Sequence, residues 1–143
     1  MKKIENFENS EACMQVKYLL EWYTDYAQNK LDLFKKPSEM YSRVHMQRQT
    51  YSDAMSFDKK RMPKKTTLMK FAIGLELDIY GFDILLERSG LLANKDDITE
   101  NIIREHIRNK NYDMEAIEEE VFLKDPNSEL IREIRKSPEK KNE

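Results

Sequence analysis

Side chains that could bind nucleic acid gather between residues 43 and 70 of this 143-residue chain. This stretch carries eight basic and two acidic residues, a net charge of +6. Arginine can bind the edge of guanine with two hydrogen bonds, and glutamine can bind adenine in the same way. Lysine and arginine also bind phosphate oxygens. The candidate DNA-binding residues are Arg43, Gln47, Arg48, Gln49, Ser52, Lys59, Lys60, Arg61, Lys64 and Lys65.

The stretch that follows has the opposite charge. Residues 71–130 carry 6 basic and 15 acidic residues, a net charge of −9. Residues 1–42 add −1 and residues 131–143 add +2, so the whole chain sums to −2, with a pI near 5.8. That total argues against a polycation that coats nucleic acid, but it leaves room for one basic face. The alternative interpretation of the basic stretch is a solvated charge run that balances the acidic half.

The other residues with reactive side chains show patterns that do not favour catalysis. His45 and His106 lie in different regions, and one cysteine, Cys13, gives no metal-ligand spacing and no disulfide. Cys13 is expected to fill apolar space, and His106 to lie on a solvent or packing face. The run of glutamates at 118–120 points in three directions on a helix, so we interpret it as a solvated face. We expect a non-enzyme without metal or cofactor.

Four aromatic residues follow a helical spacing near the N-terminus. Tyr18, Trp22, Tyr23 and Tyr26 could form a platform on which bases stack. Aromatic residues at this spacing more often pack in a core or a dimer interface, and we favour that interpretation.

Helices are the elements that must position these residues. The chain has only three glycines and four prolines, and its Leu, Ile, Met, Glu and Lys favour an all-α fold. Asp78 is expected to cap one helix and Gly90 to end it, and Gly74 inside another helix indicates close packing. The apolar spacing predicts helices over about 12–33, 37–44, 46–55, 64–75, 78–90, 96–109 and 113–123, and a short one near residue 131.

Four segments follow from these elements. We expect a flexible N-terminus over 1–11, a DNA-binding core over 12–95, a helical extension over 96–136 and a disordered tail over 137–143. No apolar run approaches the roughly 20 residues of a membrane helix, and the start has no apolar signal segment. The chain is therefore expected to be cytoplasmic, without membrane contact.

Four motifs resemble one known group of proteins. They are SEMYSRVHMQRQTYSDAM at 38–55, PKKTT at 63–67, FAIGLELDIYGFDILLERSG at 71–90 and IIREHIRNKNYD at 102–113. Their order and spacing resemble a bacterial subfamily of the Cro/CI-type (lambda-repressor-like, XRE) helix-turn-helix domains. The resemblance implies a five-helix DNA-binding bundle with two additional C-terminal helices. Two positions depart from the group: His45 stands at a turn position that is often glycine or asparagine, and Lys64 replaces a capping serine.

Two functions are compatible with these patterns. The first is a DNA-binding transcriptional regulator, a homodimer that inserts the helix at about 46–55 into the major groove of double-stranded DNA. The basic loop at 59–65 would then hold phosphates. The alternative is a protein-interaction module, antitoxin-like or a phage-defence-associated adaptor. It would dock a protein partner through the acidic C-terminal half or the aromatic first helix.

Overall fold

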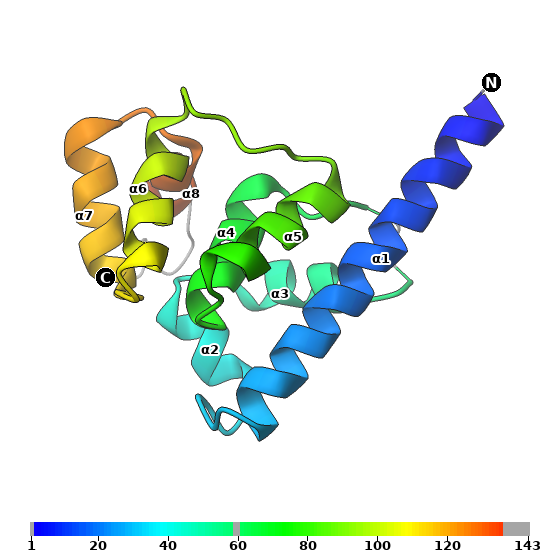
Figure 1. Cartoon of the computed structure of the whole chain (residues 1–143), viewed down its shortest axis with the longest axis horizontal. Coiled ribbons are helices and arrows are strands. Elements are labelled where there is room, and N and C mark those ends of the chain that lie inside the picture. Colours follow the sequence, from blue (N-terminus) through cyan, green and yellow to red (C-terminus); the bar gives the residue numbers. More distant parts are fainter. Residues whose placement is uncertain (1, 59–60, 136–143) are drawn as a thin grey trace.

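The computed structural model describes residues 2–58 and 61–135, with side chains over 11–58 and 61–133. All regular elements in these ranges are helices, so the expected all-α class is confirmed. The helices, shown in Figure 1, are α1 (Lys2–Asn29), α2 (Pro37–Arg43), α3 (Arg48–Met55), α4 (Lys65–Gly74), α5 (Ile79–Ser89), α6 (Ile98–Arg108), α7 (Met114–Lys124) and α8 (Glu129–Arg135). The tail expected over 137–143 lies outside the described residues. None of these helices has a stretch that is long and apolar enough to span a membrane.

One hydrophobic cluster holds the helices together. α1 crosses one edge of the molecule, α4 and α5 lie in the middle, and α6 and α7 lie on the far side (Figure 1). The cluster runs from Val16 and Leu20 on α1 through Phe71 on α4 to Ile107 on α6 and Ile131 on α8. The extension expected after residue 95 therefore shares its core with the preceding helices.

The first helix is longer at its N-terminal end than the apolar spacing indicates. α1 begins at Lys2, so residues 2–11 continue the helix instead of forming the flexible segment that we expected. This segment has no proline or glycine and is rich in lysine and glutamate, which favour helix. At the other end, α1 stops at Asn29 rather than near 33, because Asp32 takes a φ of 55° and reverses the chain.

α2 and α3 are joined by a turn over residues 44–47. Pro37 occupies the first turn of α2, as expected. In the turn, His45 has a φ of 58°, which is the left-handed conformation that glycine or asparagine usually supplies. Val44 and Met46 on either side of it are buried, so the turn is fixed in the core.

α4 is the most enclosed helix, and one glycine brings it close to α2. A Cβ on Gly74 would lie 2.6 Å from the sulfur of the buried Met40 and 3.3 Å from Val44 Cγ1. The expected close packing at Gly74 is therefore confirmed. The next helix has the expected ends: Asp78 accepts a hydrogen bond from Gly81 N at 2.8 Å, and Gly90 ends α5 with a φ of 77°.

Aspartates also begin the next two helices. Asp97 caps α6 and Asp113 caps α7, each by accepting a bond from a backbone N–H three residues on. Two large apolar residues of these helices are exposed, Ile98 and Phe122. Ile98 is the first residue of α6, and Val121, next to Phe122, takes the core position on α7.

Candidate nucleic-acid interface

α3 presents most of its candidate residues on one outward side. Arg48, Gln49 and Ser52 are exposed, and Gln49 Nε2 donates a hydrogen bond to Asp53 Oδ1 at 2.8 Å. Gln47 stands at the N-cap position, is half-buried and makes no side-chain capping bond. Three polar side chains with hydrogen-bonding groups are thus available along the first five residues of a short helix.

An open hollow of about 510 Å³ separates the start of α2 from α3. Arg48 and Ser52 line it from α3, and Lys36 lines it from the residue before α2. Tyr51 closes its floor, since its ring lies 4.9 Å from that of Tyr41 and 5.9 Å from that of Phe71. Burial raises the pKa of Tyr51. Tyr51 therefore packs inward.

A buried lysine on α1 fixes the other end of α3. Lys17 Nζ donates to the carbonyl oxygens of Asp53 at 2.8 Å and Ala54 at 3.0 Å. Burial lowers the pKa of this ammonium, while nearby Cys13 and Asp53 oppose that effect. The last carbonyls of a helix carry partial negative charge, so a cation there is favourable. Sequence reasoning missed Lys17, although its place between Cys13 and Leu20 in the apolar stripe was a signal.

Arg43 lies beside the loop after α1. Its Nη2 donates to Leu33 O at 3.3 Å, and its Nη1 lies 3.7 Å from Glu76 Oε2. The arginine is nonetheless exposed and could reach a ligand by giving up these weak contacts.

The candidates at the start of α4 are paired with acidic residues of the C-terminal helices. Lys64 Nζ lies 3.9 Å from Glu129 Oε1 on α8, and both side chains are exposed. Lys65 forms an ion pair with the buried Glu100 of α6 and donates to Leu92 O at 3.2 Å. Lys65 must lose this ion pair before it can bind a phosphate.

Lys70, the last cation of the basic stretch, is buried. It donates to His45 O at 3.1 Å and lies 3.8 Å from Glu133 Oε1. Burial lowers its pKa, and the carboxylates of Glu133 and Glu118 oppose that effect. Lys70 therefore stabilises the turn after α2 and does not add to an exposed basic face.

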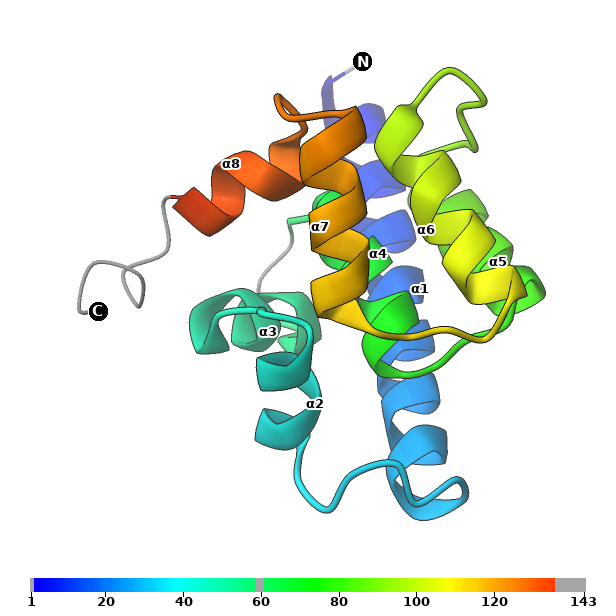
Figure 2. The same ribbon diagram turned by 90° about the vertical axis from the view of Figure 1, so that its left-hand side faces the viewer.

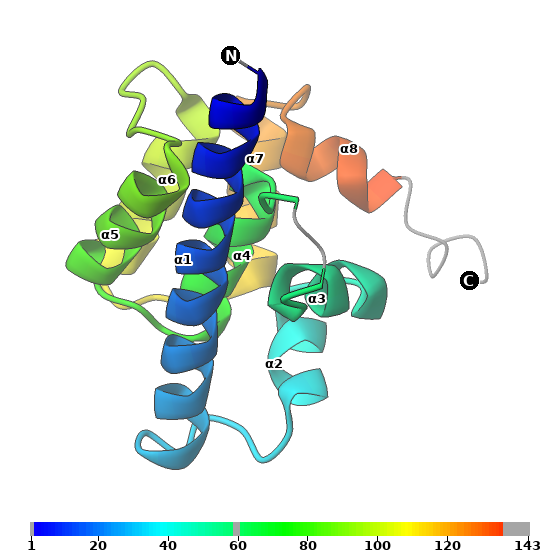
Figure 3. The same cartoon turned by 90° about the vertical axis from the view of Figure 1, so that its right-hand side faces the viewer.

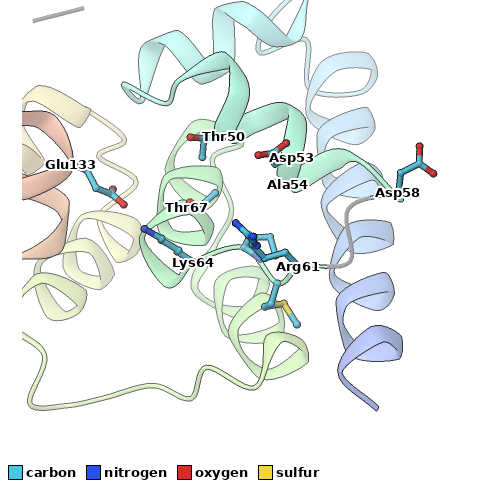
Figure 4. A pocket seen from close by; sticks show the side chains of 10 residues that line it. Thr50, Asp53, Ala54, Asp58, Arg61, Lys64, Thr67 and Glu133 are labelled. Carbon is cyan, nitrogen blue, oxygen red and sulfur yellow. The ribbon is translucent and has the colours of Figure 1, made fainter. Parts of the chain in front are cut away.

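Arg61 borders a second cavity, of about 530 Å³, on the other side of α3. Figure 4 shows Arg61 and Lys64 on one side of it and Glu133 of α8 on the other. Thr50 and Asp53 of α3 also line it. Lys59 and Lys60, the other candidates of this loop, lie outside the described residues.

α7 covers the turn between α2 and α3. His45 Nδ1 lies 2.9 Å from both carboxylate oxygens of Glu118, whose side chain is only 14% exposed, and Nε2 lies 3.6 Å from Glu115. Figure 2 shows α7 reaching this turn and α8 extending above α3. The expectation that 118–120 is a solvated face is wrong for Glu118. Glu119 is exposed, and Glu120 contacts His106 Nε2 at 3.0 Å while 35% of its side chain stays exposed.

The cations of the described ranges that form no ion pair are the ones that can bind an anionic ligand directly. Among those near α3 they are Lys36, Arg48 and Arg61. In the same ranges no group of three or more His, Cys, Asp or Glu side chains is placed to hold a metal ion. The arrangement can offer hydrogen-bond donors and a few positive charges to an anionic ligand beside a protruding helix.

Comparisons of this chain with protein-family models, curated proteins and solved structures found no match. The resemblance to the Cro/CI-type domains therefore stays a prediction. The function must be argued from the geometry of α2, α3 and their surroundings.

Proposed function

We propose that this chain binds double-stranded DNA as a transcriptional regulator, with α2 and α3 acting as a helix-turn-helix. The observation that carries the proposal is the outward side of α3, where Arg48, Gln49 and Ser52 are exposed and contribute nothing to the core. Such a helix fits the major groove, which is about 12 Å wide. The left-handed His45 supplies the tight turn that this motif needs.

Phosphate contacts would come from both sides of α3. Lys36, just before α2, and Arg61, before α4, line the hollows on the two sides of α3, and the chain itself leaves both unpaired among the described residues. Lys64 is exposed and only weakly paired. With so few contacts per protomer, we propose that two copies bind a short palindromic site together.

Selection from a randomised duplex pool at two salt concentrations tests this function. The full chain should enrich a short sequence, and its binding should weaken with salt, because each phosphate contact contributes a slope of about −0.9 in log affinity against log salt. Enrichment of a palindrome would support the dimer. If no sequence is enriched and no duplex binds at low salt, the proposed function is wrong.

A protein-interaction module is the second candidate. The observation that favours it is the pairing of Lys65 and Lys70 with acidic residues of α6 and α8, which reduces the charge available to DNA. Glu115 on α7 keeps its carboxylate mostly exposed and could meet a basic partner. Recovery of one stoichiometric partner protein together with a negative duplex selection would favour this adaptor role.

A further inference from the structure

An aromatic surface runs along the outward side of α1. Tyr18, Trp22 and Tyr26 are 58%, 60% and 43% exposed and are spaced four residues apart, so they lie on one side of the helix. Trp22 and Tyr26 stack with ring centroids 5.4 Å apart, and Tyr18 lies 4.7 Å from the ring of Phe57. These contacts form two ring pairs on the same side of α1, Tyr18 with Phe57 and Trp22 with Tyr26.

The core does not need these rings. The opposite side of α1 contributes Val16, Leu20 and Ala27 to the hydrophobic cluster, and α1 lies at the edge of the molecule (Figures 1 and 3). We expected these aromatic residues in the core or in a dimer interface; of the four, only the half-buried Tyr23 packs against the core, and the dimer interface stays a prediction. Exposed aromatic patches of this kind mark interaction sites, where Trp and Tyr contribute most of the binding energy.

The charge around the rings is acidic. Glu11, Glu21 and Asp25 are exposed on α1, and Asp58 is exposed next to Phe57. Between residues 11 and 29 the only lysine is Lys17, which is buried and bonded to the end of α3. On its α1 side this surface is therefore acidic, and two copies of it laid together would bring carboxylates against carboxylates.

We propose that this α1 surface docks an amphipathic helix of a partner protein that is rich in arginine or lysine. Apolar side chains of such a helix would cover the rings. Its cations would pair with Glu21 and Asp25 or lie over the face of Trp22, where an aromatic ring attracts positive charge. Three rings over eight residues span about 12 Å, a length that matches about two turns of one helix. The proposal does not depend on DNA binding, because it uses none of the candidate DNA-binding residues.

Trp22 makes the docking measurable, because it is the only tryptophan of the chain. The full-length protein is titrated with a synthetic 14-residue amphipathic Leu/Arg helix while Trp22 emission is recorded. We expect saturable one-to-one binding with a shift of the emission to shorter wavelength. A Leu/Glu helix of the same pattern and an oligoarginine without leucine should each bind at least tenfold more weakly.

Three double variants distinguish binding at this aromatic surface from a general effect of the protein's net charge. The double change E21K/D25K should weaken binding of the Leu/Arg helix at least tenfold, and so should Y18S/Y26S. The matched control E105K/E119K changes the same charge on exposed positions of α6 and α7, which Figure 1 places on the far side from α1, and should leave binding within twofold. Circular dichroism establishes that each variant is folded.

Three results would overturn the proposal. One is equal loss of binding in E21K/D25K and in the control, and another is an unchanged Trp22 emission at saturating peptide. The third is a dimer of the protein alone, seen by sedimentation and abolished by Y18S/Y26S, which would assign the surface to a second copy. If the selection from the duplex pool enriches no sequence, the proposed DNA binding fails but the docking proposal is unaffected. Failure of one proposal can therefore be told apart from failure of the other.

Discussion

Lys17 shows how a single charged residue inside the core can hold the end of another helix, α3. Its ammonium binds the carbonyl oxygens of Asp53 and Ala54 at the end of α3, 36 and 37 residues away in sequence. Replacing it by methionine keeps the volume but leaves these oxygens without their donor. We expect Lys17→Met to lower the free energy of unfolding by about 1–3 kcal/mol.

Urea unfolding followed by circular dichroism measures this change. Lys30→Met, at an exposed lysine just after α1, is the matched control and should stay within about 0.5 kcal/mol of the unmodified chain. Equal stability of the two variants would show that Lys17 does not hold α3 in place.

Glu100 connects α4 and α6 through a network of charges. Its carboxylate receives hydrogen bonds from Lys65, from Arg104 Nε at 2.9 Å and from Asn94 N, and Arg104 Nη1 also lies 2.7 Å from Asp83. Burial alone would raise the pKa of Glu100, but these donors outweigh it, so the pKa lies below its ordinary value of 4.5. The network therefore favours the charged carboxylate.

Because of this lowered pKa, the free energy of unfolding depends on pH in the acid range. The unfolded chain takes up the proton at higher pH than the folded one, so the contribution is complete above about pH 4.5 and is lost as the pH falls through the folded value. We expect Glu100→Gln to be less stable by about 3 kcal/mol at pH 7. Its free energy of unfolding should also change less between pH 5 and pH 3. Glu119→Gln, at an exposed site on α7, should behave as the unmodified chain does in the same urea titrations.

Part of this residue-level detail could be predicted from the sequence. Glu100 and Arg104 are spaced four residues apart with the acid first, which is the favourable order on a helix. Lys65 comes from another helix, and no local pattern indicates that it contacts Glu100. The candidates Arg48, Gln49 and Ser52 could be chosen from the sequence because they are polar residues of the helix predicted at 46–55, and all three are exposed.

At the scale of elements, the close contact between α4 and α2 depends on a glycine, Gly74, which has no side chain. A methyl group on Gly74 would overlap the sulfur of Met40, which is itself buried. We expect Gly74→Ala to destabilise the fold by about 1–3 kcal/mol through overpacking, despite the better helix propensity of alanine. The same substitution at Gly81 meets ordinary contacts of 3.4 Å or more and should be neutral or stabilising. Thermal unfolding of the two variants gives the comparison, and equal melting temperatures would contradict the packing argument.

Most helix ends could be predicted, because their signals are local. Asp78, Asp97 and Asp113 begin helices by binding a nearby backbone N–H, and Gly90 ends one by adopting a left-handed conformation. The start of α1 was missed, since the expected boundary relied on apolar spacing, which is weak before residue 12. On α7, Val121 and Phe122 are adjacent, so apolar character alone does not tell which of the two faces the core; the structure buries Val121 and exposes Phe122.

At the scale of the whole molecule, the basic stretch over 43–70 contacts acidic residues from the later part of the chain. The basic and acidic stretches were apparent from composition, but their contacts join residues far apart in the chain, such as His45 and Glu118 at a separation of 73. Pairing at this distance depends on the packing of α7 and α8 against the earlier helices. Part of the charge that we expected to face DNA is therefore used inside the chain.

Acidic residues of α8 should oppose DNA binding if α3 enters the groove. Glu129 and Glu133 lie near Lys64, Thr66 and Lys70, and Glu133 borders the cavity beside α3. We expect Glu129→Gln/Glu133→Gln to bind the selected duplex several times more tightly at low salt and to show a steeper salt dependence. Fluorescence anisotropy measures both quantities. Glu105→Gln/Glu119→Gln removes the same charge elsewhere and should give a smaller gain, and a larger gain there would show that only net charge matters.

The central claim is that α3 reads DNA through its exposed N-terminal half. The most direct measurement compares Arg48→Ala with the control Arg108→Ala for binding to the selected duplex and to duplexes with one base pair changed. We predict that Arg48→Ala loses about 1–3 kcal/mol of discrimination at one base position, while Arg108→Ala, at an exposed arginine of α6, keeps the full preference. Unchanged discrimination in Arg48→Ala would contradict the assignment of α3 as the reading helix.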